Sequence, residues 1–454
     1  MIKKMIVLFL LIICSTSLAV YEKYKIAVIG TGYVGLITGT GLAELDHYVC
    51  CVDIDEQKIN KLQNGDIPIY EPGLSELVYK NVCKGTLTFS TDIAQAIRNA
   101  QIVFIAVGTD GLPDGNPDLR AVNSVVETIK NNLDTNKVIC VKSTVPIGTC
   151  KQIAAVINSD DLQRATVLSN PEFLREGFAV YDFFNPTRIV VGSEFPEQAE
   201  IMRSLYAPLL DNNTPFFLTD LVSAEIIKYA SNAFLAVKVA YINEIAQLCS
   251  KVGANVNAVA VGMGLDDRIG NKFLSPGPGF GGSCFPKDTI ALVKKAEAFG
   301  VTLRIAASCI EANKCQKMYI VQKTAELCGN TLEGKKIAVW GLSFKANTDD
   351  VRQSAAIDII NEFLKRGALV KTYDPLAMAN MNKIIPVISY CKTKEEAIEN
   401  ADALVILTEW QEFKDFDYSL LDQYMVNSIA IDTRSIIPDG IATKNKKNIY
   451  KLGS

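Results

Sequence analysis

The chain has 454 residues, 49% of them apolar, which is enough for roughly two to four domains with buried cores. Its 46 basic and 50 acidic residues leave a formal charge of −4, which excludes the basic stripe of a nucleic-acid-binding protein. Twelve scattered cysteines without a Cys-x-x-Cys pair indicate reduced thiols, with no disulfide framework and no metal site. The single histidine, His47, leaves acid–base chemistry near neutral pH to Lys, Asp, Glu or Cys.

Residues 1–23 form an apolar leader. A basic start precedes an apolar run from Met5 to Cys14, and "SLA" offers a cleavage point, which is the layout of a secretory signal. The run is shorter than the ~20 apolar residues of a membrane-spanning helix, so an extension ahead of the first domain is the other interpretation. The reduced thiols favour a cytoplasmic catalytic body, with membrane tethering or export as alternatives.

Directly after the leader, the sequence predicts a strand, a glycine-rich turn, a helix and a second strand. "YKIAVIG" runs into "TGYVGLITGTGLAELDH" and then into "YVCCVDID". Gly30, Gly32 and Gly35 have the G-x-G-x-x-G spacing that brings backbone and a helix N-terminus close to a pyrophosphate. Asp53 lies 23 residues past Gly30, where a carboxylate binds a ribose diol and repels a 2′-phosphate. NAD is therefore favoured over NADP.

Further apolar strands alternate with helices up to residue 218, in "AQIVFIAVGT", "NKVICVKSTVP", "RATVLSNPEF" and "TRIVVGS". Such runs are typical of a parallel sheet buried on both faces, and we expect an NAD-binding Rossmann domain over residues 24–218. From residue 219 to 330 the pattern is helical. "SAEIIKYASNAFLAVKVAYINEIAQLCSKVG" has apolar residues at three and four spacing, which predicts one long helix in a central linker or dimerisation domain.

The first pattern returns over residues 331–454. "KKIAVWGLSFK", "VKTYDP", "ADALVILTEW" and "SIAIDTRS" repeat the order of the first strands, although the glycine triplet is lost. The predicted fold class is therefore α/β, with two Rossmann-like doubly wound domains joined by a long central helix. The second domain keeps the fold without the same mode of dinucleotide binding.

Three pairs of polar residues are spaced four apart: Glu172 with Glu176, Lys228 with Asn232, and Cys284 with Asp288. Residues at this spacing share a face wherever the segment is helical, so each pair can point at one site. Such pairs are also common on solvated surfaces. Lys228 and Asn232 fit that second interpretation less well because they interrupt a largely apolar helix.

Cys284 lies in the loop "SPGPGFGGSCFPKD". Pro286 suits the first turn of a helix, which places the thiol at or just before a helix N-terminus, where the dipole lowers a thiol pKa. A buried structural cysteine is the alternative, but it leaves the glycine-rich loop unexplained. A dinucleotide site and a nucleophilic thiol together indicate oxidation of an alcohol to an acid through an aldehyde and a thioester, using two NAD and one water.

In order along the chain, these motifs resemble the UDP-glucose/GDP-mannose (nucleotide-sugar) dehydrogenase family. They cover nearly all of the chain from Lys25: "GTGYVG", "IYEPGL", "STVPIGT", "NPEFLREG", "KYASNAFLAVKVAYINEIA", "DDRIGNKFL", "GFGGSCFPKD", "GLSFKANTDDVRQS" and "IDTR". "IYEPGL" and "NAFLAVKVAYINEIA" resemble the UDP-glucose branch more than the GDP-mannose or UDP-N-acetylmannosamine branches. The resemblance implies NAD-dependent four-electron oxidation of UDP-glucose to UDP-glucuronate, and a homodimer or a higher homo-oligomer.

The resemblance also implies roles. Cys284 is the nucleophile, Lys228 stabilises an oxyanion with Asn232 as a second donor, and Asp288 orients a water or acts as base in the alcohol step. Glu172 and Thr144 position the hydrolytic water. NAD contacts are implied for Gly30, Gly32, Tyr33, Val34, Gly35, Asp53, Lys58, Thr109, Thr144, Glu176 and Arg352. Contacts to the nucleotide sugar are implied for Glu172, Phe173, Leu174, Arg175, Glu176, Lys228, Asn232, Phe273, Phe280, Gly281, Lys345 and Arg434, with Arg268 reaching in from a partner subunit.

The chain departs from the family pattern at Asp110, where a proline is usual after "VGT", and in its apolar leader. Two other functions stay open at this point. One is a non-catalytic dinucleotide-binding protein, which would be expected to have lost the thiol, the lysine or the aspartate. The other is a dehydrogenase that oxidises only a carbonyl.

Overall fold

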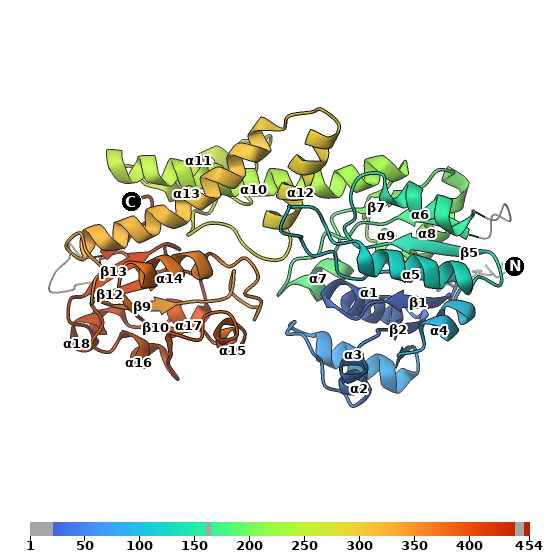
Figure 1. Ribbon diagram of the computed structural model, residues 1–454, viewed down its shortest axis with the longest axis horizontal. Coiled ribbons are helices and arrows are strands. Elements are labelled where there is room, and N and C mark those ends of the chain that lie inside the picture. Colours follow the sequence, from blue (N-terminus) through green and yellow to red (C-terminus); the bar gives the residue numbers. More distant parts are fainter. Residues whose placement is uncertain (1–20, 160–164, 441–448) are drawn as a thin grey trace, which may run out of the picture.

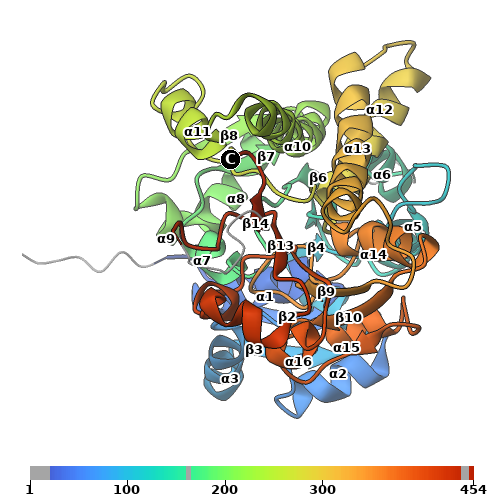
Figure 2. The same cartoon turned by 90° about the vertical axis from the view of Figure 1, so that its left-hand side faces the viewer.

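Two sheet-containing domains lie side by side, and a layer of long helices runs across both (Figure 1). The computed structural model describes residues 21–159, 165–440 and 449–454, so the apolar run of the predicted leader lies outside the described residues. In those described ranges no helix is long and apolar enough to span a bilayer. The turned view shows the helical layer covering the same edge of both domains (Figure 2).

The N-terminal domain is built on an eight-stranded sheet of order β3-β2-β1-β4-β5-β6-β7-β8. Its strands are β1 (Lys25–Ile29), β2 (Tyr48–Val52), β3 (Leu87–Ser90), β4 (Ile102–Ile105), β5 (Lys137–Val141), β6 (Ala165–Ser169), β7 (Ile189–Gly192) and β8 (Phe216–Thr219). The helices between them are α1 (Tyr33–Glu44), α2 (Glu56–Gln63), α3 (Leu74–Lys84), α4 (Ile93–Asn99), α5 (Arg120–Asn131), α6 (Thr149–Ile157), α7 (Ala179–Phe184), α8 (Glu200–Leu205) and α9 (Ala207–Leu210), with a 3₁₀ turn η1 (Pro196–Ala199).

This sheet is buried on both faces, as the apolar runs predict. In the central strand β1, Ile26 and Val28 belong to one hydrophobic core and Ala27 and Ile29 to the core on the opposite face. Alternate side chains of a strand point to opposite faces, so both faces need apolar residues when helices cover both.

One strand pair departs from the parallel arrangement. β6 and β7 meet antiparallel at Ser169 and Gly192, whereas the other neighbouring strands of this sheet are parallel. Because β7 runs antiparallel to β6, it begins at the same edge of the sheet at which β6 ends. The chain between the two strands therefore does not have to cross to the opposite edge. The connection of residues 170–188 therefore stays at the carboxyl edge of the sheet.

The central helices include α10 (Leu221–Val252), a single helix of 32 residues that confirms the predicted long helix. Asp220 caps its start by accepting a hydrogen bond from the Ser223 N–H, and Gly253 ends it in a left-handed conformation. At 1.5 Å per residue it is about 48 Å long, enough to reach from one domain to the other. The other helices of the layer are α11 (Val256–Gly264), α12 (Phe285–Ala298) and α13 (Arg304–Leu327).

The C-terminal domain repeats the N-terminal topology. Its sheet has the order β11-β10-β9-β12-β13-β14, so β10-β9-β12-β13 matches β2-β1-β4-β5. The strands are β9 (Lys336–Trp340), β10 (Leu369–Tyr373), β11 (Ser389–Tyr390), β12 (Ala403–Ile406), β13 (Ile429–Asp432) and β14 (Ile449–Lys451). The helices are α14 (Ala355–Lys365), α15 (Met378–Asn382), α16 (Lys394–Ile398), α17 (Gln411–Lys414) and α18 (Leu421–Tyr424), with a 3₁₀ turn η2 (Tyr418–Leu420).

The backbone of the first turn of this second domain donates hydrogen bonds to an aspartate of the same domain. Asp374, directly after β10, is fully buried, and its Oδ2 accepts hydrogen bonds from the backbone N–H groups of Leu342 and Ser343 at 2.7 and 3.2 Å. The indole N–H of Trp410 donates to the same oxygen at 3.2 Å. The bond from Leu342 repeats the one that the Thr31 N–H makes to Asp53 in the N-terminal turn, at 2.8 Å, so the second turn keeps this contact although it lacks the glycine triplet.

Candidate active site

The glycine-rich turn after β1 has the geometry of a dinucleotide site. Gly30 has a φ of +101°, and a Cβ there would lie 2.6 Å from the carbonyl oxygen of Ala106. A Cβ on Gly35 would lie 1.9 Å from the carbonyl oxygen of Gly30, so α1 packs tightly on the turn. A Cβ on Gly32 would meet nothing within 4 Å, which leaves open space at the N-terminus of α1. A pyrophosphate fits in that space.

Asp53 lies beside this turn, as its spacing predicts. Its Oδ2 accepts hydrogen bonds from the Thr31 N–H and hydroxyl, both at 2.8 Å, and pairs with Lys58 at 3.2 Å. Burial opposes ionisation, but these bonds outweigh it and lower the pKa of Asp53. An ionised carboxylate suits a ribose diol and disfavours a 2′-phosphate, so the residues present fit NAD.

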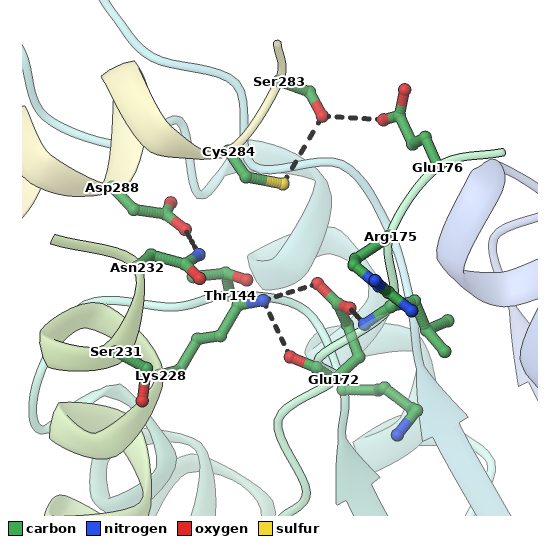
Figure 3. A network of polar contacts seen from close by, with 12 residues as sticks. Thr144, Glu172, Arg175, Glu176, Lys228, Ser231, Asn232, Ser283, Cys284 and Asp288 are labelled. Atoms are coloured by element: carbon green, nitrogen blue, oxygen red, sulfur yellow. Dashed lines mark hydrogen bonds and ion pairs between the residues drawn. The ribbon is translucent and has the colours of Figure 1, made fainter. Parts of the chain in front are cut away.

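A cavity of about 350 Å³ lies where three segments of the chain meet. The antiparallel connection after β6 supplies Glu172, Phe173, Leu174 and Arg175; α10 supplies Lys228 and Asn232; and the loop before α12 supplies Phe273 and Cys284. Figure 3 shows the polar side chains of all three segments converging on one another, with Thr144 beside them.

Lys228 and Glu172 form a buried ion pair in the wall of the cavity. Lys228 Nζ donates to Oε1 and to the backbone oxygen of Glu172, both at 2.7 Å (Figure 3). Burial opposes both charges, yet the pair outweighs it, lowering the pKa of Glu172 and raising that of Lys228. Both side chains are therefore charged near neutral pH, and Lys228 is a fixed cation in the wall of the cavity.

A second polar pair joins α10 to α12. The Asn232 amide donates to Oδ2 of Asp288 at 2.7 Å, and Lys287 Nζ binds the other carboxylate oxygen at 2.6 Å. Asp288 is fully buried. Two of the pairs spaced four apart therefore lie on helices and face the site. The third pair does not, because residues 172–176 are not helical and Glu176 points away from Glu172.

Cys284 caps α12, where Pro286 places the helix start. The sequence predicts a lowered pKa for this thiol, but the pKa is raised. Burial raises the pKa of the thiol to about 11, and the Lys228 charge opposes this only in part. Desolvation of a thiolate outweighs the helix dipole here, so the thiol is protonated at neutral pH and needs a proton acceptor when it reacts.

The glycines ahead of Cys284 make a junction between domains. The Gly282 N–H donates to the backbone oxygen of Arg352 at 3.0 Å, and a Cβ on Gly281 would lie 2.3 Å from the Gln353 backbone oxygen. This contact brings Arg352 to Glu176, with a nitrogen–oxygen distance of 3.4 Å. Ser283 donates to the same Glu176 oxygen at 3.0 Å. The loop therefore positions C-terminal residues at the site.

Other residues implied by the resemblance lie around this centre. Tyr33 accepts a hydrogen bond from the Gly177 N–H at 2.8 Å, Thr109 donates to the Thr144 backbone oxygen at 2.8 Å, and Val34 lies in α1. Phe280 packs on Phe285, with a centroid distance of 6.3 Å. Lys345 lies over the Phe178 ring, and Arg434 lies against Gly277 and pairs with Glu409 at 3.2 Å.

Arg268 is not brought to the site. It is strongly exposed and pairs with its neighbour Asp266 at 2.6 Å, so its reach to a partner's site stays a prediction. Asp110, which departs from the family pattern, contributes its negative charge to the surroundings of Arg352. His47 is buried against the Leu205 backbone oxygen and is not among the residues that line the cavity.

Sequence reasoning missed four residues of this region. Lys142 is a buried lysine of the cavity wall that binds Asn170, and burial lowers its pKa to about 8. Arg188 stacks on Phe173, with 3.7 Å from guanidinium carbon to ring centroid. Glu71 of "IYEPGL" accepts hydrogen bonds from the N–H groups of residues 177 and 179 and so holds the loop after Glu176. Ser283 is the fourth. Of these four residues, only Lys142 could have been found from the sequence, because it is a lysine directly after a buried strand.

A dinucleotide-type turn, a cavity lined by a thiol and a lysine, and a buried aspartate bound to Asn232 of the same cavity wall are the features of a nicotinamide-dependent oxidoreductase. Family models match residues 24–210 (UDP-glucose/GDP-mannose dehydrogenase family, NAD binding domain), 222–315 (central domain) and 338–439 (UDP binding domain). The chain therefore belongs to the UDP-glucose/GDP-mannose dehydrogenase family.

Relatives of known name agree with this assignment. The chain is 46% identical to the UDP-glucose 6-dehydrogenase of Rhizobium meliloti, covering 91% of this chain and 95% of the relative. It is 47% identical to UDP-glucose 6-dehydrogenase TuaD of Bacillus subtilis, covering 91% and 89%. Among solved structures, a UDP-glucose dehydrogenase from Pyrobaculum islandicum has a TM-score of 0.89 at 33% identity, covering 95% and 98%. A UDP-D-ManNAc dehydrogenase from Pyrococcus horikoshii has 0.84 at 26%, covering 94% and 99%.

Proposed function

We propose that this protein oxidises UDP-glucose to UDP-glucuronate with two NAD and one water, through a thioester on Cys284. The observation that carries the proposal is that Cys284 lines the same sugar-sized cavity as Lys228, Glu172 and Asn232, close enough to feel the charges of Lys228, Glu172 and Asp288. The relatives named UDP-glucose 6-dehydrogenase support the choice of substrate.

The chain's own residues supply the polar chemistry. NAD, when bound, supplies the hydride acceptor. Asp288 and Asn232 hold the reacting alcohol and its water, and Cys284 adds to the aldehyde carbon. Lys228 stabilises the negative oxygen that this addition creates, because its ammonium is fixed by Glu172 inside a buried site. Glu172 and Thr144 position the water that releases the acid.

Each segment of the chain has its own proposed role. We assign NAD binding to residues 24–218, the central helices and the thiol loop to residues 219–330, and the UDP end of the substrate to residues 331–454. Lys345 and Arg434 are the cations of the last segment, and a nucleoside diphosphate needs such cations. The match of residues 338–439 to the family's UDP-binding domain supports this assignment.

A homodimer is the proposed assembly. Exposed apolar side chains follow one face of α10 at spacings of seven and eight: Ile226, Phe234, Tyr241 and Leu248. A stripe of this kind on a long helix favours an interface with a second copy. We place the reaction in the cytoplasm, because a catalytic thiol has to stay reduced.

The test is the number of NADH formed per sugar consumed. The wild type is expected to form two NADH per UDP-glucose, and Cys284→Ser is expected to stall after partial oxidation. A wild-type ratio of one, or undiminished turnover of Cys284→Ser, contradicts the covalent route. GDP-mannose and UDP-N-acetylmannosamine are assayed in parallel, and a higher kcat/KM with either one overturns the choice of UDP-glucose.

A further inference from the structure

Ser283 connects the nucleophilic thiol to Glu176. Its Oγ lies 3.5 Å from Cys284 Sγ and donates to Oε1 of Glu176 at 3.0 Å (Figure 3). The single hydroxyl proton of a serine is then committed to Glu176, so its oxygen lone pairs are free to accept the thiol hydrogen. The two contacts therefore form a directed chain from S–H through O–H to a carboxylate.

Glu176 is suited to hold a proton. Its Oε2 is buried and has no hydrogen-bond partner within the described part of the chain. Burial and then the nearby Asp350 charge raise the pKa of Glu176 to about 7, while Arg352 opposes the shift. Lys345 also faces this carboxylate. A carboxylate in this setting gains and loses a proton near neutral pH.

The other carboxylates near the thiol are engaged elsewhere. Glu172 gives one oxygen to Lys228 and the other to the Leu174 N–H. Asp288 gives one oxygen to Asn232 and the other to Lys287. Of the three carboxylates around Cys284, Glu176 is thus the one with an oxygen to which no described group donates a hydrogen bond, and the carboxylate of Asp350 lies near it.

We propose that Ser283 and Glu176 form a proton relay for Cys284, a role that rests on the proposed thioester chemistry. When the thiol adds to the aldehyde carbon, the S–C bond forms and the carbonyl π pair moves to oxygen. The thiol proton passes to Ser283, whose own proton passes to Glu176. Once the hydride has left the carbon and the thioester has formed, the oxygen of water bonds to the acyl carbon and the two water protons leave to solvent as the carboxylate forms. The S–C bond pair stays on sulfur, and the proton stored on Glu176 returns through Ser283 to the thiolate.

The experiment measures the alkylation rate of Cys284 by iodoacetamide, followed by peptide mass spectrometry in the full-length protein without sugar or dinucleotide, from about pH 5 to about pH 10. In the wild type the rate is expected to rise through about pH 7 as Glu176 ionises. Ser283→Ala and Glu176→Gln are expected to lose that rise and to react about tenfold more slowly at neutral pH. Ser283→Thr, which keeps the hydroxyl, is expected to retain the wild-type profile.

Exposed Cys83 and Cys315 are internal controls, since their rates should be the same in all variants. If Ser283→Ala unfolds, buried Cys51 and Cys140 become reactive, and Glu176→Gln with Ser283→Thr decides the question. Superimposable profiles for wild type, Glu176→Gln and Ser283→Ala overturn the relay. Because the measurement needs no substrate, failure of the relay is distinguishable from absence of UDP-glucose activity.

Discussion

Asn232 and Asp288 are joined by a 2.7 Å hydrogen bond that ties the long central helix α10 to α12, one turn beyond Cys284. The bond crosses between helices that are far apart in sequence, and Lys287 completes the coordination of the carboxylate. Asp288 is therefore held in one orientation relative to the thiol.

Replacing Asp288 by Asn keeps the shape and the oxygen that Asn232 needs but removes the negative charge. We expect kcat with UDP-glucose to fall by about 100-fold or more, because a positioned acid–base group contributes that much, while the thermal midpoint changes little. The matched control is Glu297→Gln on the exposed face of α12. Wild-type turnover of Asp288→Asn would remove this carboxylate from the alcohol step.

Both side chains of the Lys228–Glu172 ion pair are buried, so each charge is stabilised by the other. Lys228→Met leaves Glu172 as a buried, unpaired acid, and we expect a loss of about 3–5 kcal/mol in the free energy of unfolding. Lys228→Met combined with Glu172→Gln removes both charges and should cost clearly less than the sum of the single changes. Urea denaturation measures all four proteins, and additive losses would show that the pair is not coupled.

Glu176 makes the stability of the fold depend on pH. Its pKa is raised from 4.5 to about 7, so the folded state binds more protons than the unfolded state between these values. Stability therefore falls as the pH rises through this window, by at most about 3 kcal/mol. Glu176→Gln should remove the fall, measured as the free energy of unfolding at several pH values. The pKa of Glu172 is lowered, so its effect on the free energy of unfolding has the opposite sign. Its stabilising contribution is lost as the pH falls. An unchanged slope in Glu176→Gln would contradict the assignment.

Two glycines of the same turn should respond differently to alanine. Gly35→Ala places a methyl group 1.9 Å from the Gly30 carbonyl oxygen, so the N-terminal domain should be destabilised. Gly32→Ala meets no protein atom within 4 Å and should fold normally, yet it should weaken NAD binding because the methyl fills the open space. Thermal melting and calorimetric titration with NAD separate the two effects. Equal melting temperatures for both variants would contradict the packing argument.

Much of the fold follows from sequence periodicity. The apolar strands, the acid after the second strand and the long apolar helix predict elements that the structure contains, because local patterns determine them. The repeat of the strand order in the C-terminal half was readable for the same reason. The antiparallel meeting of β6 and β7 was not, because strand direction depends on contacts between distant residues.

The candidate site was predictable in part. The spacing of Lys228 with Asn232 points to one face because that segment is helical, and Pro286 marks the helix that Cys284 begins. The thiol pKa could not be predicted, because it depends on how far the assembled protein desolvates the sulfur. The Ser283–Glu176 contact likewise joins residues 107 positions apart, and no local pattern indicates it.

Because the loop before α12 binds the backbone of Arg352, this loop has all of its contacts only when the last domain has folded. During synthesis Glu172 emerges first, Lys228 and Cys284 follow, and Arg352 comes last. A nascent chain that already contains the dinucleotide turn and the thiol therefore still lacks the partner that fixes the backbone of the thiol loop.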